Sequence, residues 1–340
     1  MPDRRAFLKA AGAAAAAVSI TTLPGCRGER EERRWSAAAF SKPERSRVAI
    51  LTAADYERPL RDVILAGIAP FPLEISGRRV VLKPNFVEFD PAGVINTQPA
   101  LLAATIEAFR SLGAEVVVAE GPGHRRDTEY LLEASGLDYV LRDTGTRYVD
   151  LNTDDVDLVR LRSRYTELGS LYLPRTVLGA DLLVSMPKMK THHWAGVTLS
   201  LKNMFGIVPG TLYGWPKNIL HWAGIGASIL DINAALAIPR FNIVDGIVGM
   251  EGNGPIQGEP KHSGVVVFGI DPVAVDATCA RLMSIDPLRV PYIREAGAFL
   301  GNAESESIDQ LGEGIDALRQ DYRVLERFSD LKAGFGTSGS

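Results

Sequence analysis

The sequence predicts an α/β fold with a mostly parallel sheet and helices on both of its faces. Short β-rich runs alternate with helical patterns from residue 47 onward, which is the signature of βαβ units. The chain has 340 residues, of which 46% are hydrophobic, so it is long enough for one large domain or two smaller lobes. We therefore expect an α/β body built as one domain or as two lobes.

Short runs rich in β-branched and other apolar residues mark the expected strands. RVAILT is the first, and RVVL and AEVVVA follow it along the chain. Valine and isoleucine are enriched in strands because they pack well on a pleated surface. The expected strands span residues 47–52, 79–82, 114–119, 181–186, 241–244 and 264–270.

Capping residues mark the ends of the expected helices. Asp55 is expected to N-cap a helix whose periodic apolar positions continue to about residue 68. Thr97 is expected to cap the next helix, with a proline in its first turn and Gly113 at its exit. Asp271 and Pro272 are expected to be the N-cap and first residue of a helix that runs to about residue 283.

Composition and charge exclude several classes of function. The net charge is −4 and the body has no long basic run, so nucleic-acid binding is not expected. Mean hydropathy is near zero and the body lacks a long apolar run, which argues against a membrane-spanning protein. The two cysteines, Cys26 and Cys279, are too few for a disulfide framework or a cysteine-held cluster. We therefore expect no intrinsic iron–sulfur cluster, and the sequence identifies no other cofactor.

Residues 1–26 have the pattern of an export signal. Arg4 and Arg5 precede a mildly apolar, alanine-rich stretch that resembles a twin-arginine signal; the alternative is an amphipathic N-terminal helix. LPGC (23–26) resembles a lipobox; the alternatives are cleavage without a lipid and no cleavage. We therefore expect the twin-arginine export machinery as a partner and a periplasmic or other extracytoplasmic location. Membrane contact is expected only through a lipid on Cys26.

The rest of the chain divides into three parts. Residues 27–46 are charged and patternless, so they are predicted to be a linker. Residues 47–330 form the predicted α/β domain. Residues 331–340 are predicted to be a disordered tail.

Polar residues follow most of the predicted strands. Ligands of open α/β sheets bind outside the carboxyl ends of the strands, so these residues are candidates for a shared site. Taken singly, each could be a solvated turn or a helix cap, and for Asp271 the cap is favoured. Taken together they favour a shared site. The strand-end candidates are Lys83, Asn85, Glu120, Lys188, Lys190, His192, Asp245 and Asp271.

Six blocks of the sequence occur in an order that is specific to one family. They are KPNFV (83–87), NTQPALLAATIEAFRSLGAEVVVAEGPG (96–123), GADLLVSMPKMKTHH (179–193), GVTLSLKNMFG (196–206), IVDGIVGMEGNGP (243–255) and GIDPVAVDA (269–277). In these blocks the chain resembles the domain of unknown function 362 family, from about residue 47 to residue 286. The resemblance implies little about activity, because most members are uncharacterised. Some members carry ferredoxin-like cysteine motifs, which this chain lacks, so the resemblance implies no cluster-based redox chemistry.

Four lysines form a local basic set in an acidic protein. Lys188, Lys190 and Lys202, with Lys83, predict a small anionic ligand such as a carboxylate, phosphate or sulfate. A partly buried lysine can also have a lowered pKa and act as a base or form a Schiff base. The alternative is that these side chains extend from a strand end into solvent.

The segment MPKMKTH (186–192) is expected to be a strand end and the loop that leaves it. His192 and His193 are neighbours, so in an extended segment at most one enters a given site, and His192 is favoured. A metal site is an alternative for which His192, His221 and Glu251 are candidate ligands. The sequence shows no metal-binding spacing such as HxH or HExxH.

The glycine-rich segment MEGNGP (250–255) follows a predicted strand. Its backbone N–H groups could approach an anion, with Glu251 as a general base; a flexible surface loop is the alternative. Asp276 lies inside the helix that begins near Asp271 and faces either the site or solvent. Cys279 is predicted to be a small buried residue.

Three hypotheses about function follow. The first is an exported enzyme that acts on a small anionic substrate at a strand-end cleft. The second is a lipid-tethered binding protein for an anionic metabolite or cofactor, without catalysis. The third is a metal-dependent enzyme, because LKNMFGIVPG (201–210) resembles a Lys-then-Pro-Gly stretch in nickel-pincer lactate racemases, which use an organometallic nucleotide.

The enzyme hypothesis assigns roles to particular residues. Proton transfer is expected from Lys190, His192, Asp245 and Glu251. Substrate binding is expected from Lys83, Asn85, Glu120, Lys188, Lys202, Asn203 and Asp271.

Overall fold

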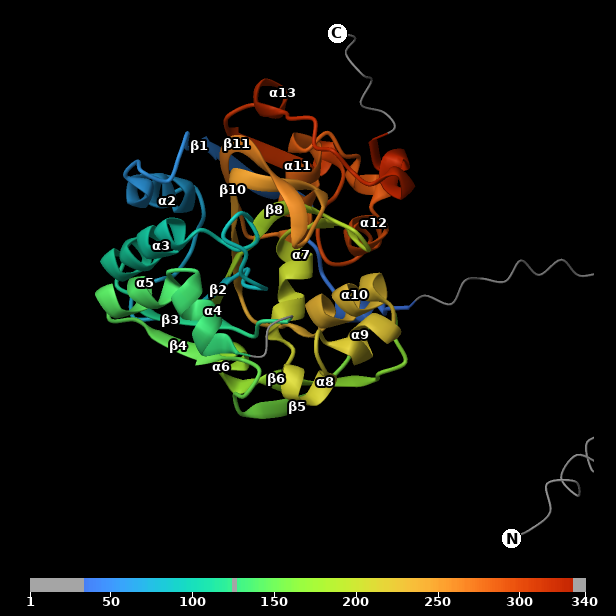
Figure 1. The fold of residues 1–340 in the computed structure, drawn as a ribbon. Coiled ribbons are helices and arrows are strands. Elements are labelled where there is room, and N and C mark those ends of the chain that lie inside the picture. Colours follow the sequence, from blue (N-terminus) through green and yellow to red (C-terminus); the bar gives the residue numbers. More distant parts are fainter. Residues whose placement is uncertain (1–33, 124–126, 333–340) are drawn as a thin grey trace, which may run out of the picture. The chain divides into compact units, whose positions relative to one another are not determined.

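One large sheet runs through the fold (Figure 1). The computed structural model describes residues 34–123 and 127–332. In this part of the chain the strands follow the order β12-β1-β11-β10-β7-β2-β3-β4. Their bounds are β1 (Ser46–Thr52), β2 (Arg79–Pro84), β3 (Glu115–Glu120), β4 (Arg147–Asp150), β7 (Leu182–Met186), β10 (Arg240–Asn253), β11 (Gln257–Gly269) and β12 (Ile308–Gly312).

Neighbouring strands of this sheet are mostly parallel. β10, β7, β2, β3 and β4 pair in parallel in that order, and β12 pairs in parallel with β1. β11 runs antiparallel to both β1 and β10. The predicted mostly parallel α/β sheet is therefore confirmed, and every predicted strand overlaps an observed one.

β10 and β11 form a hairpin that extends well beyond the two predicted strands. Met250 pairs with Pro260 and Asn253 with Gln257. MEGNGP is therefore the end of this hairpin, which corrects the prediction of a glycine-rich loop. Gly254 lies against the neighbouring strand so closely that a Cβ there would stand 2.1 Å from a backbone oxygen.

The lysine-rich segment KMKTH forms a strand, β8 (Lys188–His192), which corrects the predicted loop. β8 pairs in parallel with the middle of β10, where Lys188 lies opposite Asp245 and Lys190 opposite Met250. On its other side it pairs antiparallel with β9 (Gly196–Thr198). Every residue of β8 is buried. The polar side chains of this segment do not predict a buried strand. The strand forms because β9 and β10 pair with it and cover it, since strand propensity depends strongly on context.

Helices cover both faces of the sheet, as predicted (Figure 1). The alternation in β2 separates two cores, since Val80 and Leu82 pack on one face and Val81 on the other. Burial on both faces explains why the strands are continuous apolar runs. One face carries α2 (Leu60–Ile68), α3 (Pro99–Ser111), α4 (Thr128–Ala134) and α5 (Leu137–Asp143), and the other carries α7 (Ser200–Asn203), α10 (Ile225–Ala235), α11 (Pro272–Leu282) and α12 (Pro291–Gly297).

No helix in the described ranges is long and apolar enough to span a bilayer.

Smaller elements connect these layers. β5 (Val156–Arg160) and β6 (Ser170–Pro174) pair as a separate antiparallel sheet. The remaining elements are α6 (Arg175–Leu178), α8 (Gly210–Tyr213), α9 (Asn218–Trp222) and α13 (Ile315–Leu318), with the 3-10 helices η1 (Ala37–Ala39), η2 (Met204–Ile207), η3 (Pro287–Arg289), η4 (Ser305–Ser307) and η5 (Glu326–Lys332).

Two of the predicted helix caps have other roles. α2 begins at Leu60, and Asp55 instead accepts a hydrogen bond from Glu57 N in the preceding turn. The Thr97 hydroxyl donates to Met186 O at 2.5 Å and accepts from Asn85 N at 2.8 Å, so it links the ends of β2 and β7. Asp271 does cap α11, because its carboxylate accepts from two backbone N–H groups of the first turn.

Packing corrects both predicted domain boundaries. The rings of Trp35 and Phe40, in the predicted linker, lie 5.1 and 4.9 Å from the ring of Phe299. At the other end, η5 includes the buried Leu331, so residues 331–332 belong to the domain and not to a tail. The predicted export signal with Cys26, residues 27–33 and residues 333–340 lie outside the described residues.

Asp276 faces neither solvent nor a ligand site but anchors α7. It is fully buried on α11, and its carboxylate accepts from Ser200 N at 2.7 Å and Leu201 N at 3.0 Å. These are backbone donors at the start of α7 that have no acceptor within the helix. The contact fixes the position of α7, which carries Lys202 and Asn203.

We predict that Asp276→Ala lowers the free energy of unfolding by about 2 to 4 kcal/mol, because two buried N–H groups lose their acceptor. Urea denaturation measures the change. The control is Asp62→Ala at an exposed position of α2, which should stay within about 0.5 kcal/mol of the unchanged protein. Equal stability of the two variants would show that Asp276 does not hold α7.

Candidate functional site

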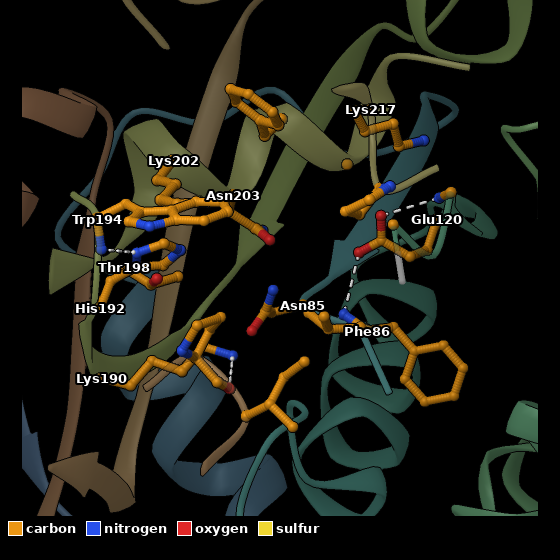
Figure 2. A pocket seen from close by; sticks show the side chains of 18 of the residues that line it. Asn85, Phe86, Glu120, Lys190, His192, Trp194, Thr198, Lys202, Asn203 and Lys217 are labelled. Atoms are coloured by element: carbon orange, nitrogen blue, oxygen red, sulfur yellow. Dashed lines mark hydrogen bonds between the residues drawn. The ribbon is translucent and has the colours of Figure 1, made fainter. Parts of the chain in front are cut away.

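A cavity of about 200 Å³ lies at the carboxyl ends of β2 and β3 (Figure 2). β8, α7, η2, α9 and the end of the β10–β11 hairpin contribute its other walls. We call this cavity the lysine pocket. Its polar lining side chains are Lys83, Asn85, Glu120, Lys190, His192, His193, Thr198, Lys202, Asn203, Lys217 and His221, and its larger apolar ones are Phe86, Val87, Trp194, Phe205, Pro216, Pro255 and Ile256.

A buried ion pair lies at the base of the lysine pocket. Lys83 Nζ and Glu120 Oε2 are 2.5 Å apart, and both side chains are inaccessible to solvent. Lys83 Nζ also donates to Asn203 Oδ1 at 3.1 Å, and Glu120 accepts from Phe86 N at 3.1 Å and Gly121 N at 2.9 Å. Burial lowers the pKa of Lys83 and raises that of Glu120, while the pairing opposes both shifts.

Gly206 allows this ion pair to approach the backbone of η2. A Cβ at Gly206 would lie 2.2 Å from Glu120 Oε1 and 2.7 Å from Lys83 Nζ. Both distances are shorter than normal contacts, so a side chain here would displace the ends of Glu120 and Lys83. The glycine that ends the block KNMFG therefore lets the ion pair keep this position.

The other three lysines of the pocket have no carboxylate partner among the described residues. Lys190 Nζ donates to the backbone oxygens of Ile95 at 2.8 Å and Pro255 at 3.3 Å. Lys217 Nζ donates to Asn152 Oδ1 at 2.6 Å. Lys202 Nζ has no hydrogen-bond acceptor in the described chain and lies 4.9 Å from the centre of the Phe205 ring.

Burial lowers the pKa of each of these three amines. The pKa of Lys190 is well below its ordinary value because of burial and the nearby charge of Lys202. Burial and the charge of Lys83 lower the pKa of Lys202 to about 8. Burial lowers the pKa of Lys217 to about 7. Two amines therefore titrate near neutral pH, where acid–base catalysis is most effective.

The hydrogen bonds of His192 determine which ring nitrogen carries the proton. Nδ1 accepts from Trp194 N at 3.0 Å and from Ala195 N at 3.2 Å (Figure 2). A backbone N–H can only donate, so Nδ1 is unprotonated and Nε2 carries the hydrogen. Burial and nearby positive charges also lower the pKa of His192 well below its ordinary value. The ring is thus a neutral N–H donor, which corrects its expected role as a base.

Two buried polar atoms of the lining have no partner in the described structure. They are Asn85 Oδ1 and Thr198 Oγ1, and both residues are at least nine-tenths buried. Figure 2 shows the Asn85 amide between Glu120 on one side and Lys190 and His192 on the other. Buried polar groups are normally hydrogen-bonded, so these atoms indicate room for a polar ligand group.

Lys188 and Asp245 lie outside the lysine pocket, which corrects the expectation of one site for all strand-end residues. They are neighbours in the β8–β10 pairing and form a buried ion pair of 2.7 Å. Tyr56 OH donates to Asp245 Oδ1 at 2.7 Å and accepts from Lys188 Nζ at 2.9 Å. Every charge of this cluster has a partner, so it holds β8 to β10.

Glu251 and Asp271 also lie away from the pocket. Glu251 pairs with Lys261 at 3.3 Å on the hairpin and accepts from Arg323 N. Asp271 follows β11, which runs antiparallel to β1 and β10. The carboxyl end of β11 therefore lies beside the amino ends of those strands, on the side of the sheet opposite to the pocket. There Asp271 accepts from Ser46 Oγ at 2.6 Å, at the first residue of β1.

The candidate metal ligands are not brought together. His192 and His221 line the same pocket, but Glu251 does not. Within the ranges that the structure describes, no group of three or more His, Cys, Asp or Glu side chains could hold a metal ion. His193 lines the pocket together with His192, since the chain turns after β8 and the two rings lie 4.9 Å apart. The expectation that only one of them enters the site was therefore wrong.

Sequence reasoning missed Lys217, Thr198 and the aromatic part of the lining. Lys217 lies between a proline and an asparagine, a context typical of an exposed turn. In the structure it is 2% exposed and has a φ of 68°, an uncommon conformation for a residue with a Cβ. No local pattern signals this burial, because it depends on contacts with the side chain of Asn152, which is 65 residues away in the sequence, and with the backbone oxygen of Val208.

Comparison with known proteins identifies a family. A family model described as "Domain of unknown function (DUF362)" matches residues 80–281, from β2 to α11. The chain belongs to the DUF362 family. The matched span contains every residue that lines the pocket.

Two more distant similarities accompany this DUF362 match. The chain is 29% identical over 231 residues to the thylakoid-associated protein sll1697 of Synechocystis sp. (strain ATCC 27184 / PCC 6803 / Kazusa), covering 63% of this chain and 66% of that protein. The lactate racemase apoprotein from Thermoanaerobacterium thermosaccharolyticum matches with a TM-score of 0.34 and 17% identity, covering 66% of this chain and 56% of that one. A similarity at that TM-score has no bearing on function.

We predict strong coupling between Lys83 and Glu120. Lys83→Met or Glu120→Gln alone should lower the free energy of unfolding by about 3 to 5 kcal/mol, because each leaves a buried charge without its partner. The double variant should lose less than the sum, as measured by urea denaturation of all four proteins. Glu74→Gln, which breaks the exposed Arg78–Glu74 pair, should cost under about 1 kcal/mol. Additive losses would contradict the coupling.

We also predict that Lys202→Met raises the free energy of unfolding at pH 7 by about 1 to 2 kcal/mol. The folded state lowers the pKa of Lys202 from 10.5 to about 8, so below pH 8 it holds an unfavourable charge. That cost disappears as the pH rises from about 8 to 10.5, so the difference in stability between Lys202→Met and the unchanged protein should become smaller. Thermal unfolding between pH 7 and 10 measures this difference, with Lys42→Met at an exposed position as the control. A destabilised variant would show that Lys202 supports the fold.

Proposed function

We propose that this DUF362 protein is an enzyme that binds a small anionic substrate in the lysine pocket and transfers a proton on it. The observation that carries the proposal is the charge of the lining. In the described chain four lysines line the cavity against one carboxylate, Glu120, which is already paired with Lys83. A buried excess of ammonium groups is unfavourable until an anion enters.

The polar groups around the cavity support anion binding. Lys190 and Lys202 approach it from β8 and α7, and neither has an ion-pair partner in the described part of the protein. The Nε2–H of His192 is a further donor from β8. An anion with hydroxyl or N–H groups could also satisfy Asn85 Oδ1 and Thr198 Oγ1, which otherwise lack partners.

Lys202 is the residue that we assign to proton transfer. Its amine has no acceptor in the described residues, and its pKa of about 8 leaves a neutral fraction at physiological pH. The neutral amine takes a proton from a carbon next to a carbonyl or carboxylate, the electron pair stays on the substrate, and the ammonium form returns the proton. The N–H groups of Lys190 and His192 stabilise the negative charge in between.

Two alternatives use the same residues differently. A binding protein without catalysis would use the lysine pocket for affinity alone, and it differs from the enzyme only in lacking turnover. A metal-dependent enzyme would need ligands beyond His192 and His221, since Glu251 lies elsewhere. Export by the twin-arginine route and lipidation at Cys26 are proposals that concern residues outside the described structure.

We predict that acetate binds most tightly below pH 7 and about tenfold more weakly by pH 9, as Lys217 and Lys202 lose their protons. Acetate itself stays ionised throughout this range. Isothermal titration across the range measures the affinity. Lys202→Met should weaken binding at pH 7 and remove the part of the pH dependence near pH 8, whereas Lys42→Met should change neither.

Hydrogen–deuterium exchange separates the enzyme from the binding protein. In D2O, proton NMR follows loss of the C3 hydrogen signals of pyruvate and 2-oxobutyrate. The enzyme should accelerate exchange over buffer, and Lys202→Met should abolish the acceleration. Binding of these acids without accelerated exchange would contradict proton transfer and favour the binding protein. Failure to bind any carboxylate at any pH would refute both.

A further inference from the structure

Aromatic rings form one continuous wall of the lysine pocket. Consecutive ring centroids are 4.9 Å apart for His192 and His193, 4.6 Å for His193 and Trp194, 5.3 Å for Trp194 and His221, and 5.2 Å for His221 and Phe205. Each of these residues lines the cavity. The spacings are those of packed aromatic pairs. We call this wall the aromatic arc.

The aromatic arc is uncharged at neutral pH. Burial lowers the pKa of His192, His193 and His221, and the charge of Lys202 lowers each further. The three histidines therefore act as neutral rings and not as additional cations. The arc presents an apolar surface beside the ammonium groups.

Apolar side chains from other elements complete the enclosure. Phe86 follows β2, and Ile256 comes from the end of the β10–β11 hairpin. The charged groups lie directly beside these walls, as Lys202 Nζ shows by its distance of 4.9 Å from the ring centre of Phe205. The pocket thus combines a cationic part with an apolar part. A compact, uniformly polar anion would contact the cationic part and leave the apolar part without contacts.

Trp194 lies at the opening of the pocket. It lines the cavity, yet 56% of its surface is exposed. A large aromatic side chain held at a cavity opening offers area that an apolar ligand group can cover. Trp222 on α9 is 81% exposed but does not line the cavity, so it is a matched control.

We propose that the substrate of the lysine pocket is an amphiphilic carboxylate, with its head at the lysines and its apolar body along the aromatic arc. This inference rests on the proposed function, because it names the substrate class for the same pocket. The cavity of about 200 Å³ corresponds to about seven water molecules at about 30 Å³ each. That volume fits a carboxylate with an aliphatic or aromatic body of about six carbons.

The test compares acetate, butyrate, hexanoate, phenylacetate and adipate by isothermal titration at pH 7. Each methylene that the walls bury should tighten binding by up to about fourfold, so hexanoate should exceed acetate by about tenfold or more. Adipate has the length of hexanoate with a second carboxylate at its far end. It should bind about tenfold more weakly than hexanoate, because that charge must leave water against apolar side chains.

Variants locate the apolar subsite. Trp194→Ala should lower the hexanoate-to-acetate affinity ratio by about fivefold, and Ile256→Ala, at the end of the β10–β11 hairpin, should also lower it. Trp222→Ala should leave the ratio unchanged. Circular dichroism confirms that each variant is folded.

Each outcome decides between the two proposals. If acetate and hexanoate bind equally, or adipate binds as tightly as hexanoate, the amphiphilic substrate is wrong while anion binding stands. If Trp222→Ala changes the ratio as much as Trp194→Ala, the apolar subsite lies outside the aromatic arc. If no carboxylate binds, both this inference and the proposed function fail.

Discussion

The desolvation of lysine side chains is the constraint on which the candidate site depends. Moving an ammonium group out of water costs several kcal/mol unless a counter-charge accompanies it. Lys83 has such a partner in Glu120. Lys190, Lys202 and Lys217 have carbonyl oxygens, an amide or an aromatic ring instead. The proposal of an anionic ligand rests on these three amines, because no carboxylate of the described residues accompanies them.

The ion pair and its surroundings determine where these charges lie. Lys83 lies near the end of β2, Glu120 ends β3 and Asn203 belongs to α7, so their contacts join two strands to a short helix. Asp276 fixes the same helix from α11, and Gly206 lets the backbone pass next to the pair. α7 is only one turn long and would not be stable alone, so its position, and that of Lys202, comes from these tertiary contacts.

The hydrogen-bond pattern of β8 changes the chemistry that its residues can perform. A histidine beside lysines is a natural candidate for a base, but two backbone N–H groups occupy Nδ1 of His192 and leave only a donor. The proposed proton transfer therefore uses an amine, and burial lowers the pKa of Lys202 to about 8. The same burial keeps the histidine rings neutral, so one physical effect produces both the amine that we propose for proton transfer and the apolar wall.

The sequence by itself determined six strands of the sheet, the helices α2, α3 and α11, the family and the core of the site. Continuous apolar runs predict strands buried on both faces, and the strand-end residues Lys83, Asn85, Glu120, Lys190 and His192 do meet at one cavity. Only the tertiary structure decided which other residues join them. β11 is antiparallel to its neighbours, so Asp271 lies at the other ends of the strands, far from the pocket. The pairing of β8 with β10 places Lys188 next to Asp245, where the two form an ion pair. Local patterns record neither strand direction nor register, because both arise from pairing between segments far apart in the chain.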